Sequence, residues 1–183
     1  MKSEDISRRS FLKRAAALSA AAAIPSFWIP SKANAMPGVP FVSANEKVRI
    51  AFIGIGNRGG EIAQELYKTG LCEVVALCDV DMGAPHTQKL ISMFPKVPRF
   101  QDFRQMFDKM ADKIDAVTVG VPDHAHFPIT IEAMAHGKHV YVEKPMARTF
   151  QEIEVMMRAE KKFGVVTQMG NQGHSEANYF QFK

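Results

Sequence analysis

The chain has 183 residues, with 23 lysines and arginines against 19 aspartates and glutamates, a formal net charge of +4 at pH 7. The first 35 residues hold six of the basic and two of the acidic residues, so the remaining 148 carry 17 of each and are neutral. This balance lacks the basic excess typical of nucleic-acid-binding proteins, and we expect no nucleic-acid partner. The 148 residues suffice for one domain with its own core.

The first 35 residues have the pattern of an export signal. A twin-arginine motif, SRRSFLK over residues 7–13, precedes a mildly apolar run from Ala15 to Ile24, and Ala33-Asn34-Ala35 offers a cleavage site. The run is far shorter than the roughly 20 residues that span a bilayer. We therefore predict a twin-arginine signal peptide over 1–35 and a periplasmic or secreted mature protein without a membrane span. An uncleaved anchor or a disordered basic tail is the alternative.

The chain after residue 35 divides into a linker and one domain. Residues 36–46 are proline-rich and aperiodic, which predicts a linker. From residue 47, short apolar runs alternate with helical patterns, typical of a parallel sheet with helices on both faces. We predict a doubly wound α/β domain over 47–175. Strands are expected at 48–55, 72–80, 114–121, 139–142 and 165–170, and helices at 58–68, 85–94, 103–110, 126–136 and 150–163.

The two cysteines, Cys72 and Cys78, lie six residues apart in one predicted strand. At about 3.3 Å per residue their Cα atoms are roughly 20 Å apart. A disulfide needs Cα atoms within about 7 Å. We therefore predict two unpaired thiols that fill core positions, despite the oxidising destination that the leader implies.

Residues 54–60 read GIGNRGG and connect a predicted strand to a predicted helix, the context that a dinucleotide-binding turn requires. In such a turn Gly54 permits the sharp bend, Gly56 lets the backbone approach a pyrophosphate, and Gly59 lets the helix pack on the strand. The helix N-terminus offers N–H groups and partial positive charge to the phosphates. A glycine-rich turn that binds nothing is the alternative.

An acidic residue completes the dinucleotide pattern. Asp79 lies at the end of the second predicted strand, 25 residues after Gly54, near the spacing at which a carboxylate hydrogen-bonds a ribose diol. The same carboxylate would repel a ribose 2′-phosphate. We therefore predict NAD rather than NADP as the cofactor.

The stretch 121–126, VPDHAH, follows the third long predicted strand. In open parallel sheets ligands bind beyond the carboxyl ends of the strands, so Pro122, Asp123 and His126 are candidate cofactor contacts. Asp123 is equally suited to cap the following helix. The H-x-H spacing of His124 and His126, with His136 and His139 nearby, raises a metal site as an alternative. No cysteine or carboxylate completes a tetrahedral set, so we predict no metal.

The stretch 139–147, HVYVEKPMA, ends a predicted strand in two charges and a proline. Pro145 ends the strand because it donates no ladder hydrogen bond. Glu143 and Lys144 then share the crevice with the glycine turn. A lysine there is expected to be partly desolvated, which favours proton transfer. A surface salt bridge made by Glu143 is the alternative.

The ordered motifs GIGNRG, LCDVD, VPDHAHF and GKHVYVEKPMA resemble the N-terminal half of the Gfo/Idh/MocA family of oxidoreductases. The resemblance covers residues 47 to about 175 and implies a Rossmann domain that holds NAD(P). It places Lys144 beside the nicotinamide and the sugar hydroxyl that is oxidised, as the catalytic residue of this stretch. It further implies cofactor contacts at Asn57, Arg58, Asp79, the 122–126 turn, Glu143, Lys144 and Asn171, with His174 less firmly assigned.

The resemblance also implies a second α/β domain that this sequence lacks. In the family that domain supplies substrate contacts and a catalytic histidine. Residues 176–183 are interpreted as the truncated start of the next segment. The longer protein is expected to form a homo-oligomer.

The leader and the cofactor motif together constrain the expected reaction. Free NAD is not supplied outside the cytoplasm, so an exported enzyme must carry a bound cofactor and return its hydride in the same site. We expect an NAD-dependent oxidoreductase acting on a small carbohydrate substrate, a sugar or a glycoside, at a hydroxyl. The alternatives are an NAD-dependent glycoside hydrolase of the same family and a non-catalytic exported binding module.

Overall fold

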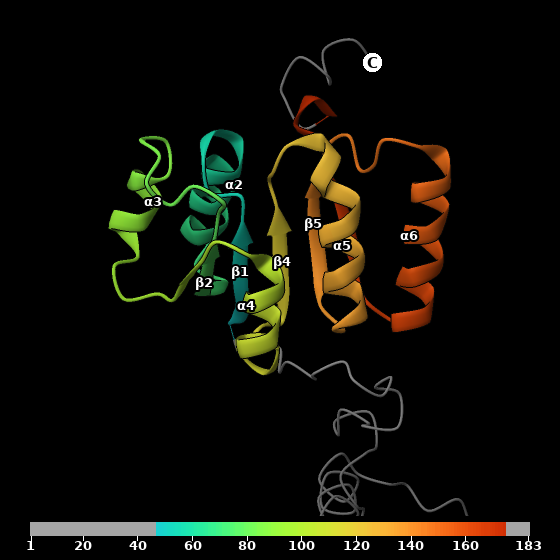
Figure 1. Ribbon diagram of the computed structural model, residues 1–183, viewed down its shortest axis with the longest axis horizontal. Helices are drawn as coiled ribbons and strands as arrows, with labels where there is room; N and C mark the ends of the chain where they lie inside the picture. The colour runs from blue at the N-terminus through green and yellow to red at the C-terminus, as the bar shows by residue number, and fades with distance from the viewer. Residues whose placement is uncertain (1–46, 175–183) are drawn as a thin grey trace, which may run out of the picture. The chain divides into compact units, whose positions relative to one another are not determined.

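The computed structural model of the chain describes residues 47–174, so the predicted signal peptide, linker and final segment lie outside the described residues. Six strands form one parallel sheet in the order β3-β2-β1-β4-β5-β6 (Figure 1). They are β1 (Val48–Ile53), β2 (Cys72–Cys78), β3 (Arg99–Phe100), β4 (Ala116–Val119), β5 (His139–Glu143) and β6 (Thr167–Gly170). The order reverses between β1 and β4, which creates the switch point at which such sheets bind ligands. The predicted Rossmann-type α/β fold is confirmed.

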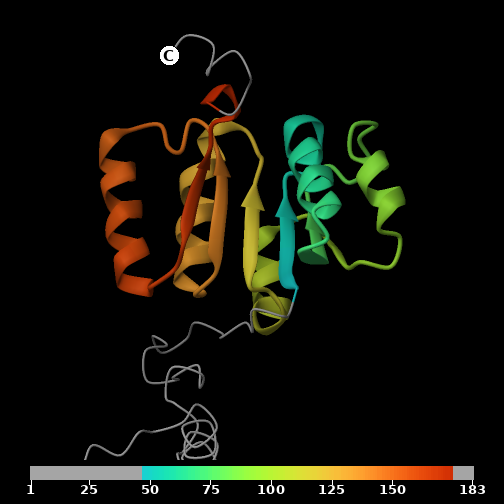
Figure 2. The ribbon, with the colours of Figure 1, turned by 180° about the vertical axis from the view of Figure 1, so that it is seen from behind.

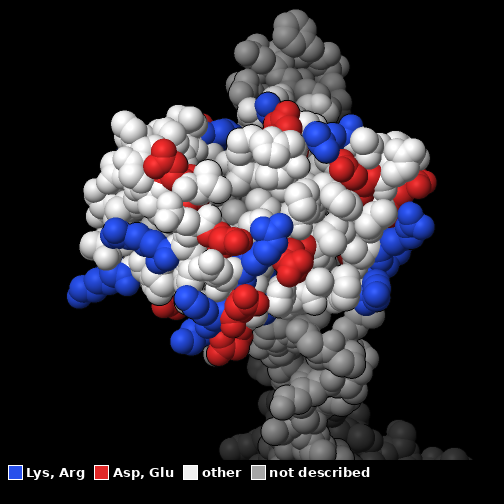
Figure 3. Space-filling model, in the orientation of Figure 1, with Lys and Arg blue, Asp and Glu red and all other residues white. Residues whose placement is uncertain are grey.

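Helices pack on both faces of this sheet. They are α2 (Asn57–Lys68), α3 (Gln88–Met93), α4 (Phe103–Met110), α5 (His126–Ala135) and α6 (Phe150–Phe163), with 3₁₀ turns η2 (Ala111–Lys113), η3 (Asp123–Ala125) and η4 (Gln172–His174). Figure 1 shows α4, α5 and α6 on one face, and Figure 2 shows α2 and α3 over β1 and β2 on the other. Figure 3 shows basic and acidic side chains interspersed over the face that carries α4 and α5.

Strand β1 divides its side chains between two hydrophobic cores. Ala51 and Ile53 join the cluster beneath α4, α5 and α6, whereas Ile50 and Phe52 join the cluster beneath α2 and α3. Successive side chains of a strand point to opposite faces, so a strand buried on both sides is apolar throughout. This is why the buried part of β1, Ile50 to Ile53, is a continuous apolar run instead of an alternating one.

The helix and strand ends follow recognisable backbone signals. Helix α6 has the predicted bounds 150–163: it begins at a capping box between Thr149 and Glu152 and is followed by Gly164, whose φ is +63°. Strand β1 ends two residues earlier than predicted because Gly54 turns the chain with φ of +80°. Helix α3 is shorter than the predicted 85–94 because residues 85–87 form turns, in which the Thr87 and Gln88 N–H groups donate to carbonyls three residues back, those of Ala84 at 3.1 Å and Pro85 at 3.4 Å.

Strand β3 was not predicted. Its two residues, Arg99 and Phe100, pair with Leu77 and Cys78 of β2. A segment of two residues carries no hydrophobic period, so only its pairing with β2 identifies it. Its position matters for the site because it directs the following residues toward the carboxyl end of β2.

The amino ends of the strands are held by an ion pair. Asp115 is 2% exposed and accepts hydrogen bonds from the Arg49 backbone N–H, Nε and Nη2 at 2.9, 3.0 and 2.6 Å. Burial alone would raise the pKa of the Asp115 carboxyl, but the hydrogen bonds from Arg49 outweigh burial and lower that pKa. This contact ties β1 to β4 at the edge opposite the predicted site.

Cys72 and Cys78 are both free and buried, which confirms the prediction of unpaired core thiols. Among residues 47–174, no helix combines the length and apolar character that crossing a lipid bilayer requires.

Candidate functional site

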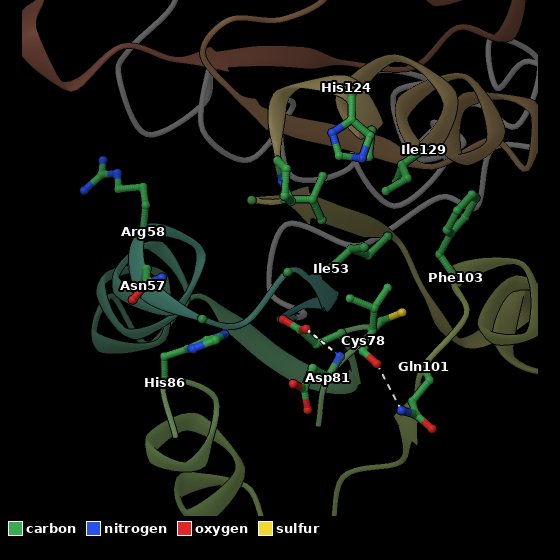
Figure 4. Close-up of a pocket in the computed structure, with 18 residues that line it drawn as sticks. Ile53, Asn57, Arg58, Cys78, Asp81, His86, Gln101, Phe103, His124 and Ile129 are labelled. Atoms are coloured by element: carbon green, nitrogen blue, oxygen red, sulfur yellow. Dashed lines mark hydrogen bonds between the residues drawn. The ribbon is translucent and has the colours of Figure 1, made fainter. Parts of the chain in front are cut away.

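A pocket of about 650 Å³ opens at the carboxyl ends of β1, β2 and β4 (Figure 4). Asn57, Arg58 and His86 lie on one side of it, and Gln101 and Phe103 lie on the other. Its lining includes six of the predicted site residues: Gly54, Gly56, Asn57, Arg58, Asp79 and Pro122. The pocket therefore lies at the switch point, where a dinucleotide was predicted to bind.

The glycine turn is packed too tightly for side chains. A Cβ at Gly54 would overlap the Gly120 carbonyl, and a Cβ at Gly59 would overlap the Gly54 carbonyl. A Cβ at Gly120 would stand 2.6 Å from the Gly59 Cα. These three glycines allow β1, the start of α2 and the end of β4 to meet, so the role predicted for Gly59 in close packing is confirmed.

The space in front of Gly56 holds an imidazole. A Cβ at Gly56 would overlap the His86 ring and stand 2.8 Å from its Nε2. His86 is exposed, and it comes from the segment between β2 and α3. This side chain therefore faces the backbone that was predicted to approach a pyrophosphate. The sequence contains no motif that marks His86.

Asp79 connects the end of β2 to the glycine turn. Its Oδ2 accepts the Ile55 N–H at 2.9 Å, and its Oδ1 accepts the Asp81 N–H at 3.0 Å. A carboxylate offers about four acceptor positions, so both oxygens retain capacity for ribose hydroxyls. Asp81 adds a second carboxylate to the pocket lining. The arrangement offers carboxylate oxygens that can accept hydrogen bonds from a diol.

The N-terminus of α2 is open toward the pocket. Its N-cap, Gly56, makes no side-chain hydrogen bond, and its first turn carries no acidic residue. Helices α3 and α5 likewise lack a side-chain cap, whereas α4 and α6 are capped by Asp102 and Thr149; among the uncapped helices, α2 is the one whose first residues, Asn57 and Arg58, line the pocket. The N–H groups of a first helical turn have no partner within the helix, so α2 can receive an anion. Asn57, in this turn, has φ of +40°.

The turn after β4 contributes to the pocket differently from the prediction. Pro122 and His124 line it, whereas Asp123 is exposed outside the lining. Asp123 also makes no capping hydrogen bond to η3 or α5, so the helix-cap alternative is wrong. His124, which the resemblance included among the cofactor contacts of the 122–126 turn and which was also weighed as a metal ligand, lines the pocket (Figure 4).

His126 does not line the pocket. Its side chain is 1% exposed, with Nδ1 2.6 Å from the Pro145 carbonyl oxygen and Nε2 2.8 Å from the Val121 carbonyl oxygen. Both ring nitrogens are thus occupied by backbone groups. The prediction of a direct cofactor contact for His126 is therefore revised: the ring lies behind the pocket wall and joins two of its segments.

The end of β5 carries a buried carboxylate and an exposed lysine. Glu143 Oε1 lies 3.3 Å from Arg58 Nε, and Glu143 Oε2 accepts the Lys144 N–H at 3.3 Å. The alternative of a salt bridge at Glu143 is thus realised, but with a carboxylate that is 6% exposed and not at the surface. Lys144 is exposed at the end of β5, and its predicted desolvation beside a bound nicotinamide stays a prediction.

Two further residues lie at this end of the sheet: Asn171, which was predicted, and Tyr141, which was not. Asn171, a predicted cofactor contact, is exposed just after β6 and outside the pocket lining. The Tyr141 hydroxyl and Glu143 Oε1 crowd Gly170, where a Cβ would stand 2.6 and 2.5 Å from them. Burial and the charge of Glu143 raise the pKa of Tyr141. This cluster adjoins the Arg58–Glu143 pair.

Several residues that complete the pocket carried no sequence signal. Gln101 donates to the Val80 carbonyl at 3.0 Å and follows the short strand β3, which was itself missed. Phe103 and Ile129 supply apolar wall. Cys78 lies at the pocket floor, where burial, and secondarily Asp79, raises the pKa of its thiol to about 12. That thiol is unsuited to act as a nucleophile at neutral pH.

The four histidines that were weighed as an alternative metal site, His124, His126, His136 and His139, have different surroundings. His136 stacks on Phe107 and lies 3.4 Å from a Glu132 oxygen, while His139 Nδ1 accepts the Val166 N–H at 2.9 Å. The part of the chain that the structure describes holds no group of three or more His, Cys, Asp or Glu side chains arranged for a metal ion.

The sequence has curated relatives of greater length. The Glycosyl hydrolase family 109 protein 1 of Shewanella sp. (strain ANA-3) and the alpha-N-acetylgalactosaminidase of Shewanella oneidensis are each 30% identical to it over 164 residues. These alignments cover 81% of the chain and 35% of each relative. The chain therefore spans little more than a third of the length of these relatives.

Solved structures share the fold. A dehydrogenase from Chromobacterium violaceum is 25% identical, with a TM-score of 0.67 over 75% of this chain and 39% of that one. The WlbA (WbpB) dehydrogenase from Thermus thermophilus, solved with NAD and alpha-ketoglutarate, has a TM-score of 0.67 at 20% identity over 74% of this chain and 45% of that one.

Residues 48–171 match the family described as "Oxidoreductase family, NAD-binding Rossmann fold", GFO_IDH_MocA. This match accounts for the sheet order, the glycine turn and the pocket at the switch point. The chain therefore belongs to the Gfo/Idh/MocA family of oxidoreductases and contains its NAD-binding Rossmann domain.

Proposed function

We propose that the chain is the cofactor-binding part of an exported, NAD-dependent enzyme that oxidises a hydroxyl of a sugar or glycoside. The observation that carries the cofactor assignment is the pairing of Asp79 with the glycine turn, beside an α2 N-terminus that has neither cap nor acidic first turn. A diol acceptor and an anion site thereby adjoin in one pocket. The carboxylates of Asp79 and Asp81 favour NAD over NADP.

The residues present fit this cofactor. NAD, when bound, supplies the site with a hydride acceptor that can also return the hydride. Asp79 would hold the adenosine ribose, and the first-turn N–H groups of α2 would hold the pyrophosphate. Lys144, beyond the Arg58–Glu143 pair, is proposed to hydrogen-bond the substrate hydroxyl and to help remove its proton. The exposed amine has the freedom to reach a substrate brought by another segment.

The substrate class rests on the relatives. One of them is named as an alpha-N-acetylgalactosaminidase, which favours a second candidate: glycoside cleavage that begins with oxidation and ends with reduction of the sugar. Both candidates need the same pocket and the same lysine. They differ in their products. The oxidoreductase would pass the hydride from one sugar to a second sugar and release one oxidised and one reduced product, whereas cleavage would return the hydride to the same sugar and release an aglycone. The remaining length of the protein would supply the substrate contacts and form the proposed homo-oligomer.

The location and the cofactor cycle are proposed together. The Arg8-Arg9 pair and the following cleavage pattern support export by the twin-arginine route, which moves folded proteins. An enzyme exported in this way would leave with NAD already bound. The cofactor would then be reduced and reoxidised in the same site during each turnover.

Native mass spectrometry of the full-length protein, purified from the periplasm, tests the proposal. The expected result is one NAD per chain, retained through purification. Replacing both leader arginines with lysine (Arg8→Lys with Arg9→Lys) should leave the precursor in the cytoplasm. Bound NADP, or a periplasmic protein that neither contains nor binds a dinucleotide, would contradict the proposal.

A further inference from the structure

The His126 ring joins the backbone of two pocket segments. Its Nδ1 contacts the carbonyl of Pro145, the residue after Lys144, and its Nε2 contacts the carbonyl of Val121, which lines the pocket. The two carbonyls belong to chain segments that leave β4 and β5. The ring is 1% exposed, so solvent does not compete for these contacts.

The His126 ring connects the two segments beyond the last backbone pairing of β4 with β5. The β4–β5 ladder ends with the pairing of Val119 and Val142. Beyond that pair, β4 leads into the pocket turn and β5 leads through Glu143 into Lys144. The contacts of His126 bridge these two segments past the end of the ladder. They thereby fix the separation between the pocket turn and the backbone that carries Lys144.

We propose that His126 is a positioning residue that sets Lys144 relative to the cofactor pocket. The inference rests on the proposed function, in which Lys144 works beside bound NAD. Its basis is one ring whose two nitrogens both approach carbonyl oxygens within hydrogen-bond distance. Any buried imidazole needs polar partners; the distinctive feature here is that the two partners are the backbones of the two segments that flank the pocket.

The amide side chains separate the two contacts. Asparagine places a donor near the position of Nδ1, and glutamine places one near the position of Nε2. His126→Asn therefore keeps a donor toward Pro145, and His126→Gln keeps one toward Val121. Each variant retains a polar group in a polar site, whereas His126→Phe keeps an aromatic ring and removes both ring nitrogens. His136→Phe, at the other end of α5, is the matched control, because His136 stacks on Phe107 away from the pocket.

The readout is the NMR signal of the Lys144 side chain in the 183-residue chain, assigned with Lys144→Ala, during titration with NAD. In the unaltered protein and in His136→Phe, NAD should shift this signal. In each His126 variant the shift should fall to half or less, while the NAD affinity, set by the glycine turn and Asp79, stays within about threefold. A purely structural role of His126 would lower the melting temperature without this selective loss.

The outcomes separate the inference from the function on which it rests. Full retention of the Lys144 shift in the Asn and Gln variants overturns the positioning role and leaves the proposed function intact. Failure of the unaltered protein to bind NAD overturns the proposed function. If the variants fail to fold, the test uses the unaltered protein. The NMR signal of its hydrogen-bonded His126 ring N–H should shift together with the Lys144 signal as NAD binds. A ring signal that does not shift overturns the inference.

Discussion

Arg58, in the first turn of α2, and Glu143, at the end of β5, form an ion pair with an Nε–Oε1 distance of 3.3 Å. They lie 85 residues apart in the sequence. The Glu143 side chain is 6% exposed, and the Arg58 side chain is 42% exposed. The pair thus connects the helix that is proposed to hold the pyrophosphate with the strand that carries Lys144.

Arg58→Met should destabilise the protein because it leaves the buried Glu143 carboxylate without its charged partner. We expect a loss of about 1–3 kcal/mol in the free energy of unfolding, measured with urea. Glu61→Gln is the matched control, since Glu61 pairs with the same guanidinium at 3.1 Å but is 66% exposed. An exposed pair typically contributes at most about 1 kcal/mol. Equal effects of the two substitutions would show that the Glu143 contact has no special role.

Gly56→Ala and His86→Ala should be energetically coupled. The φ of Gly56 is −92°, which alanine adopts freely, so the obstacle to a Cβ is the His86 ring. We expect Gly56→Ala to cost about 1 kcal/mol of unfolding free energy, the low end for overpacking, because the exposed ring can turn away. The double variant should recover this loss. Gly54→Ala should not be rescued by His86→Ala, since it meets the Gly120 backbone and has φ of +80°. Additive effects at Gly56 and His86 would contradict the contact.

The ion pair between Asp115 and Arg49 should stabilise the protein at neutral pH and lose its effect in acid. The folded-state pKa of Asp115 is lowered below its ordinary value of 3.8, so the unfolded chain binds the proton first as the pH falls. Asp115→Asn should therefore cost about 3 kcal/mol near pH 7, the low end for breaking a buried pair. The difference from the unaltered protein should shrink as the pH falls below about 4.

Asp112→Asn provides the control for this pH dependence. Arg49 contacts only the backbone carbonyl of Asp112, at 3.1 Å, and this contact survives the substitution. Urea unfolding curves between neutral pH and pH 3 should show a change within about 0.5 kcal/mol for this exposed site. A stability difference for Asp115→Asn that is independent of pH would contradict the ion-pair interpretation.

The thiol of Cys78 should be unreactive although it lies at the pocket floor. Burial raises its pKa to about 12, so almost no thiolate is present at pH 8. Burial also raises the pKa of Cys72. Titration with a disulfide reagent should detect no thiol in the native protein and both thiols in urea. Rapid labelling of Cys78 in the native state would indicate an opening of the pocket that this structure does not contain.

Apart from β3, the succession of strands and helices along the chain was predictable because these elements have local sequence patterns. Apolar runs mark the buried strands, and Gly164 marks the end of α6. The glycine turn and Asp79 were predictable for the same reason, since the turn requires particular residue types at fixed spacing. These signals lie within about ten residues of the structure that they specify.

The remaining parts of the site depend on contacts between distant segments. Strand β3 is defined by its pairing with β2, and His86 and Gln101 reach the pocket only because α3 and β3 fold beside β2. The sequence singled out His126 as a candidate site residue, but it did not indicate where the ring points. The ring orientation depends on the Val121 and Pro145 carbonyls, which come from two separate segments. The exposure of Lys144 likewise depends on packing around β5, which no local pattern encodes.

The most direct test of the central claim is an NMR titration of the chain with NAD, following the backbone amide signals. We expect the largest changes in amide chemical shift at four residues that line the pocket: Gly54, Gly56, Asn57 and Asp79. Asp79→Ala should weaken NAD binding by roughly ten- to a hundredfold, as expected for a charge-assisted hydrogen bond. NADP should bind more weakly than NAD to the unaltered chain. The absence of shifts at millimolar NAD, or shifts confined to residues away from the glycine turn, would contradict the account.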